Sequence, residues 1–167
     1  MSEQGRVSKD LHLSSSIEQS RAETVILSEI NRLYGLSLEP ARFSLSDKLS
    51  VQIDGIDEKN SVLCEIYARV GKLKGSQPDK LASDLLKMAL VEKLTDRVWR
   101  KIMCFCDESA AMTLKGRSWL AAAAEHFAVE VIVVEIPEKI RESLITAQKR
   151  QVMVNRGADE QEQENGA

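Results

Sequence analysis

The hydrophobic period of this sequence changes back and forth between that of a helix and that of a strand, and no other feature limits the fold more. Apolar side chains recur at helical spacing in some segments and alternate with polar ones in others. The pattern predicts helices over 17–34, 77–94, 109–127 and from 137 to about 154, and strands over 42–56, 61–70, 97–106 and 129–136. This order predicts an α/β protein whose mixed sheet has helices on both faces.

The periodic part of the chain lies between two polar ends. We expect residues 1–16 to form a flexible tail and residues 155–167 to form a disordered acidic tail, because both offer few apolar groups to bury. Residues 17–154 then form a single α/β domain. The stretch VEVIVVEI, residues 129–136, is the richest in β-formers, and we expect it at or near the centre of the sheet.

Composition excludes several classes of protein. The net charge is −3, so the chain as a whole has no general attraction for nucleic acid. No stretch approaches the roughly 18–20 apolar residues of a membrane span, and the polar N-terminus favours a cytoplasmic protein without a membrane partner. Three cysteines without a CxxC pair and two histidines argue against a zinc site.

Two acids on neighbouring predicted strands raise a question of chemistry. Asp54 and Glu65 lie among apolar residues on either side of the turn signal 57–60, so a hairpin would bring their carboxylates close together. Carboxylates at short range repel unless a cation lies between them, and oxygen ligands suit Mg²⁺ or Mn²⁺. The alternative is that Asp54 caps the turn and Glu65 points to solvent from an edge strand.

Asp54, ten intervening residues and Glu65 on the next strand resemble the PD-(D/E)XK nuclease superfamily, which has the restriction-endonuclease-like fold. The predicted element order resembles it too, from residue 17 to about 136. The resemblance implies an α-β-β-β-α-β core with an extra C-terminal helix. Its three-stranded meander would comprise Phe43–Leu45, Leu49–Ile56 and Val62–Val70.

The resemblance also implies a metal-dependent nuclease that hydrolyses phosphodiester bonds of nucleic acid. Asp54 and Glu65 would hold one or two Mg²⁺ or Mn²⁺ ions as catalytic and metal-binding residues. Glu29 would be the additional metal-directed acid of the first helix by its position. Gln77 and Lys80, on the helix after the meander, would contribute polar groups to the site.

The sequence departs from the superfamily pattern at one position. The pattern has a lysine two residues after the second acid, and this chain has Tyr67. Tyr67 could hydrogen-bond a phosphate but supplies no positive charge, since its reference pKa is near 10. Arg69, Lys80, Lys72 or Lys74 could supply that charge from another backbone position.

Two neighbouring features have simpler explanations. The glycine-flanked basic loop 69–75 could contact a phosphate backbone through Lys72 and Lys74, but an ordinary solvated connection explains it as well. Asp107 follows a strand and precedes a helix, so we expect a helix cap there, with a role as an extra ligand as the alternative.

Three hypotheses of function follow. The first is the metal-dependent nuclease, with DNA or RNA as partner and with a homodimer or a partner protein left open. The second is a catalytically inactive member of the same fold that acts as a binding or assembly module. The third is a doubly wound ligand-binding or regulatory domain. The order of the sheet separates it from the first two, because a meander packed on the first helix favours the nuclease fold and an all-parallel sheet would eliminate that fold.

Overall fold

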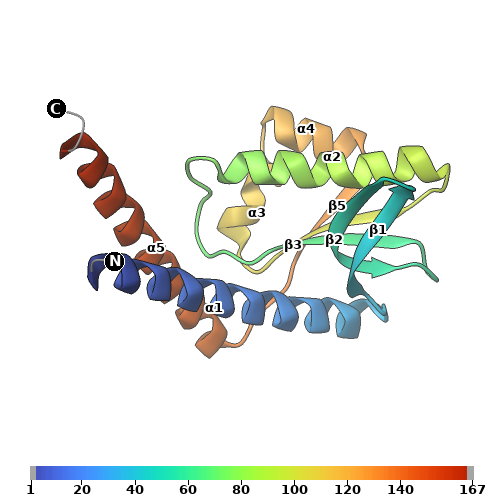
Figure 1. Ribbon diagram of the computed structural model, residues 1–167. Helices are drawn as coiled ribbons and strands as arrows, with labels where there is room; N and C mark the ends of the chain where they lie inside the picture. Colours follow the sequence, from blue (N-terminus) through green and yellow to red (C-terminus); the bar gives the residue numbers. More distant parts are fainter. Residues whose placement is uncertain (1–2, 165–167) are drawn as a thin grey trace.

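The computed structural model describes the backbone of residues 3–164 and the side chains of residues 16–153. Within these residues one five-stranded sheet has the order β1-β2-β3-β4-β5 (Figure 1). The elements are α1 (Glu3–Tyr34), β1 (Glu39–Ser46), β2 (Leu49–Asp57), β3 (Val62–Tyr67), α2 (Gln77–Thr95), β4 (Arg100–Phe105), α3 (Glu108–Lys115), α4 (Trp119–His126), β5 (Val129–Val133) and α5 (Glu138–Glu164). The expected α/β class is confirmed.

The sheet is mixed, as expected. Strands β1, β2 and β3 form an antiparallel meander, and β3, β4 and β5 are parallel. The meander excludes an all-parallel doubly wound domain. It also makes β3 the central strand, so its six residues are all buried.

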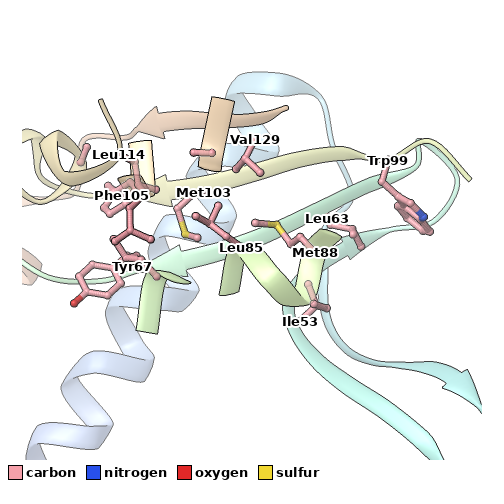
Figure 2. Packing of buried hydrophobic residues seen from close by; sticks show 14 of the residues in the cluster. Ile53, Leu63, Tyr67, Leu85, Met88, Trp99, Met103, Phe105, Leu114 and Val129 are labelled. Atoms are coloured by element: carbon pink, nitrogen blue, oxygen red, sulfur yellow. The ribbon is translucent and has the colours of Figure 1, made fainter. Parts of the chain in front are cut away.

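Helices cover both faces of the sheet and divide the core in two. Helices α1 and α5 pack on one face, and α2, α3 and α4 pack on the other (Figure 1). The cluster under α2 includes Leu63, Leu85, Met88, Met103 and Phe105 (Figure 2). The cluster under α1 and α5 is built from the alternate positions of the same strands, such as Cys64 and Ile102, because successive strand residues face opposite sides.

Strand β2 contains an irregularity that matters for the site. Ala41 pairs with Ile53, but Glu39 pairs with Ile56, so β2 has one residue more than β1 in this interval. Ile53 and Ile56 therefore both join the cluster under α2, although strict alternation would put them on opposite faces. The bulge lies at Asp54 and Gly55. At Gly55 a Cβ would come 2.9 Å from Leu27 of α1, so glycine permits this close approach.

Three expectations differ from the structure. The segment 109–127 forms two helices, because Ser118 starts α4 anew with its hydroxyl accepting the Ala121 N–H at 3.1 Å. Strand β5 is an edge strand, and the expectation of a central position for 129–136 was wrong. The backbone of α1 and α5 is helical from Glu3 and up to Glu164, within the segments expected as tails, while residues 1–2 and 165–167 lie outside the described part.

The β5 error has a physical reason. A run of Val and Ile indicates that helices cover the faces of a strand, but a strand covered on its faces can still lack a neighbouring strand at one edge.

None of the described helices is long and apolar enough to span a membrane.

Candidate functional site

Strands β2 and β3 separate at the bulge, and the two acids predicted from the sequence lie at this fork. The strands pair from Asp57 and Val62 to Gly55 and Cys64, where the described pairing ends. Beyond it the Ile66 N–H donates to Asp54 Oδ2 at 2.9 Å, and the Asp54 N–H donates to Glu65 Oε2 at 3.4 Å. Each carboxylate thus accepts a hydrogen bond from a backbone N–H of the opposite strand, and these two bonds hold the acids close together.

Glu65 is buried in the centre of the sheet. Its residue exposure is 1 %, so the alternative of a solvent-facing acid on an edge strand is wrong. Burial, followed by the charges of Asp54 and Asp84, raises the pKa of Glu65 from 4.5 to about 8, although the Lys87 ammonium acts in the opposite direction. Lys87 Nζ lies 2.6 Å from Oε1, close enough for an ion pair but not aligned as a hydrogen bond.

Helix α2 contributes an acid between two lysines. Asp84 is buried and accepts Lys80 Nζ at 2.9 Å on one oxygen, while Lys87 Nζ lies 2.9 Å from the other. Lys87 also donates to the Gln52 carbonyl of β2 at 3.1 Å. Burial lowers the pKa of both lysines, but the nearby carboxylates, Asp84 for both and Glu65 for Lys87, outweigh it and raise the pKa.

Positions 80, 84 and 87 lie on one flank of α2. Three and four residues make about one helical turn, so these side chains follow one another along the same face. They border the buried stripe that contains Leu81, Leu85 and Met88. We call Asp54, Glu65, Asp84, Lys80 and Lys87 the acid–lysine cluster.

Tyr67 lies beside this cluster and not among its ion pairs. The residue is 3 % exposed, and its ring centroid lies 5.7 Å from that of Phe105 (Figure 2). Lys80 Nζ lies 5.7 Å from the centroid of the Tyr67 ring. Burial raises its pKa, so the hydroxyl keeps its proton at neutral pH. Tyr67 can donate a hydrogen bond at the edge of the cluster but brings no charge.

The first helix brings a different acid near Asp54 than the one expected. Glu23 is half-buried, and burial, with a smaller contribution from the charge of Asp54, raises its pKa. Glu29 instead forms a 2.5 Å ion pair with Arg32. Six residues along a helix correspond to roughly 9 Å and 240° of rotation, so Glu29 faces another direction than Glu23. The structure therefore does not bring Glu29 together with the strand acids.

The basic residues predicted from the loop gather around a hollow next to the cluster. The hollow has a volume of about 620 Å³ and lies between the loop after β3 and the exposed side of α5. Arg69, Lys72, Lys74 and Gln77 line it, together with residues of α5. Gln77 also accepts the Lys74 N–H at 2.9 Å, which links the loop to the first turn of α2. We call this hollow the basic groove.

Asp107 is the helix cap that the sequence predicted. Its carboxylate accepts the N–H groups of Ser109 and Ala110 at the start of α3. The same carboxylate accepts the Gly71 N–H at 3.2 Å and pairs with Arg141 of α5 at 2.5 Å. Burial by itself raises the pKa of Asp107, but Arg141 and the backbone donors outweigh it and lower the pKa. Asp107 is thus a structural junction.

Sequence reasoning missed Glu23, Asp84 and Lys87. The sequence contained a signal for Asp84 and Lys87. They follow Lys80 at intervals of four and three residues, which places all three on one flank of the helix, beside its apolar stripe. The sequence could not show that Glu23 rather than Glu29 faces Asp54, because the rotation of α1 about its axis depends on how the helix packs on the sheet. Among the described residues, no group of three histidine, cysteine or acidic side chains is arranged as a ready metal site.

Comparison with known proteins does not place this chain in a family. No family model, no curated protein and no solved structure matches it. The fold and site therefore define it as an α/β protein with a mixed sheet and a buried acid–lysine cluster at the fork of β2 and β3.

Proposed function

We propose that this chain is a metal-dependent nuclease that hydrolyses phosphodiester bonds at the acid–lysine cluster. The observation that carries the proposal is the position of Lys87 Nζ, 2.6 Å from Glu65 Oε1 and 2.9 Å from Asp84 Oδ1. Phosphoryl chemistry needs a cation near the acids, and Tyr67 offers none. Lys87, and next to it Lys80, would supply that cation from α2.

The acids fit a weakly held divalent metal. Mg²⁺ commonly binds through one or two protein carboxylates and completes its shell with water and substrate phosphate. Asp54 and Glu65 lie together, and the buried Oε1 of Glu65 has only the Lys87 ammonium beside it, at 2.6 Å, so a cation already occupies the position next to the acids. These two residues would hold Mg²⁺ or Mn²⁺, which when bound would acidify a water and neutralise charge on the phosphate.

The remaining side chains have roles that follow from their positions. Lys87 and Lys80 would stabilise the negative charge that develops on the phosphoryl oxygens. Tyr67 would donate a hydrogen bond from a neutral hydroxyl. Arg69 lines the basic groove and would contact the substrate backbone.

A second candidate function is a binding module of the same fold without catalysis. The observation that favours it is the internal neutralisation of the cluster, in which Lys80 and Lys87 already occupy Asp84 and Glu65. Such a cluster could serve only to hold β2, β3 and α2 together.

Calorimetry and cleavage assays on four proteins separate these functions. Mn²⁺ is titrated into the wild type, Asp54→Asn/Glu65→Gln, Lys87→Gln and the control Lys93→Gln, which alters an exposed lysine of the same helix. We expect binding to disappear only in the double variant. Lys87→Gln should keep the metal and lose about 100-fold or more in cleavage of a labelled oligonucleotide.

The outcomes decide between the two functions. Metal binding without cleavage of single- or double-stranded DNA or RNA would favour the binding module. An absence of Mn²⁺ binding in the wild type would contradict the nuclease proposal and leave the cluster a structural one.

A further inference from the structure

The basic groove concentrates positive charge in an acidic protein. The chain carries a net charge of −3, yet Arg69, Lys72, Lys74 and Lys149 all line this one hollow. No acidic side chain is among the described residues that line it. The charge of the groove therefore suits an anionic partner, and more than one phosphate could contact it.

Apolar side chains line part of the groove, and we call this part its apolar floor. These side chains are Val70 from the loop and Ile145, Val152 and Met153 from α5. Val152 and Met153 are 48 % and 72 % exposed, so both present apolar surface to solvent next to the basic side chains. A partner that presented only phosphates would leave this floor uncovered.

The loop that carries the basic residues is held in place. The side-chain amide of Gln148 accepts the Val70 N–H and donates to the Val70 carbonyl, both at 2.9 Å, as a neighbouring strand would. Asp107 accepts the next N–H, that of Gly71, at 3.2 Å. The positive φ values of Gly71 and Gly75 then turn the chain around Lys72 and Lys74. The groove is thus formed before any ligand binds.

The groove leads towards the acid–lysine cluster. Arg69 and Gln77 line both the groove and a second hollow of about 320 Å³. Tyr67 and Lys80 line the second hollow, and Lys80 is paired with Asp84 of the cluster. A strand bound in the groove would therefore continue to the candidate site.

We propose that the basic groove binds unpaired nucleotides, so that single-stranded nucleic acid is the preferred partner. The phosphates would contact the basic rim and the base faces would lie on the apolar floor. In a duplex the base faces are stacked on one another, and only the rim would be used. This inference deepens the proposed nuclease function and rests on it for the choice of a nucleic acid.

Fluorescence anisotropy in EDTA tests the groove without any cleavage. The probes are a labelled single strand of about twelve nucleotides, in the size range of single-strand-binding sites, and a duplex of the same sequence. The proteins are the full chain, Lys72→Gln/Lys149→Gln, Met153→Ser, and the control Lys93→Gln/Lys139→Gln, which removes two exposed lysines elsewhere.

We expect the wild type to bind the single strand about tenfold or more tightly than the duplex, because only the single strand offers its bases. Lys72→Gln/Lys149→Gln should reduce the slope of log affinity against log salt by about 1.4, as for two lost phosphate contacts on a single strand. Met153→Ser should weaken the binding of the single strand more than the binding of the duplex. The control should match the wild type.

Equal affinity for both probes, no binding to either, or an equal loss in the control would overturn the proposal. The assay also separates this inference from the nuclease proposal. If the protein prefers single strands but never cleaves them, the result would support the proposed role of the groove and contradict the proposed nuclease activity. If the protein binds and cleaves both forms equally, the result would support the proposed nuclease activity and contradict the proposed role of the groove.

Discussion

Glu65 illustrates how neighbouring residues decide the charge of one side chain. A carboxylic acid in a central strand loses its hydration, and burial is the main cause that raises its pKa to about 8. Asp54 and Asp84 act in the same direction, while Lys87 opposes them. Near neutral pH a cation that bound at the acids would therefore displace a proton from the cluster.

The raised pKa predicts a specific pH dependence of stability. The folded protein holds a proton on Glu65 that the unfolded chain releases above 4.5, so the free energy of unfolding should fall as pH rises from 4.5 to about 8 and then level off. The expected contribution is at most about 1.4 kcal/mol per pH unit within this window. Glu65→Gln, measured by urea unfolding at several pH values, should show a shallower decline than the wild type.

Glu58→Gln is the matched control for this measurement, because Glu58 is an exposed acid in the turn after β2. It should follow the wild-type curve. Identical slopes in Glu65→Gln and the wild type between pH 5 and 8 would mean that Glu65 is ionised in the folded protein.

At the scale of elements, the site depends on where strands and helices begin and end. The bulge in β2 places Asp54 at the fork. Without the bulge, Ile53 and Asp54 would each face the side of the sheet opposite to the one they face now. The loop after β3 depends on Asp107 and Gln148, which come from the α3 cap and from α5. Elements distant in sequence thus hold the short segment that carries the basic groove.

We predict that Asp107→Ala destabilises the protein more than the loss of an ordinary helix cap. Asp107 caps α3, accepts the Gly71 N–H and pairs with Arg141, so its removal should lower the free energy of unfolding by about 2–4 kcal/mol. Ser118→Ala removes the α4 cap and an exposed hydrogen bond from its hydroxyl to the Thr113 carbonyl, and should cost about 1 kcal/mol. Chemical denaturation measures both variants, and equal losses would contradict the junction assigned to Asp107.

At the scale of the whole molecule, one sheet separates two hydrophobic clusters. Ile26 of α1 belongs to the cluster under α1 and α5, whereas Trp99 belongs to the cluster under α2. Strands β3 and β4 contribute alternate residues to both clusters. Neither cluster can lose its strands without exposing the other, so the molecule should unfold in a single transition.

A core substitution on one face should therefore be detected by a probe on the other. Trp119 is 71 % exposed and can be replaced by Phe, which leaves Trp99 as the fluorescent reporter. In this background Ile26→Ala should lower the free energy of unfolding by about 2–5 kcal/mol. Trp99 fluorescence and far-UV circular dichroism should report the same midpoint, and separate midpoints would indicate that the two layers unfold independently.

Local patterns were sufficient for the type and order of most elements. The helix over 77–94 and the turn at 57–60 were predicted closely, because apolar spacing and turn residues act over a few positions. The same information placed Asp54 and Glu65 on neighbouring strands, β2 and β3. It failed for 109–127, where Ser118 starts a second helix, and for the edge position of β5.

The sequence by itself determined which segments become helices and strands, and that two acids would lie on adjacent strands, since both follow from the local period of side chains. Only the tertiary structure decided that Asp54 lies in a bulge, that Glu23 and not Glu29 approaches it, and that Lys87 and Asp84 reach Glu65 from α2. Each of these depends on the rotation and register of one element against another. Packing sets that rotation through the burial of side chains distant in sequence, which no local pattern encodes.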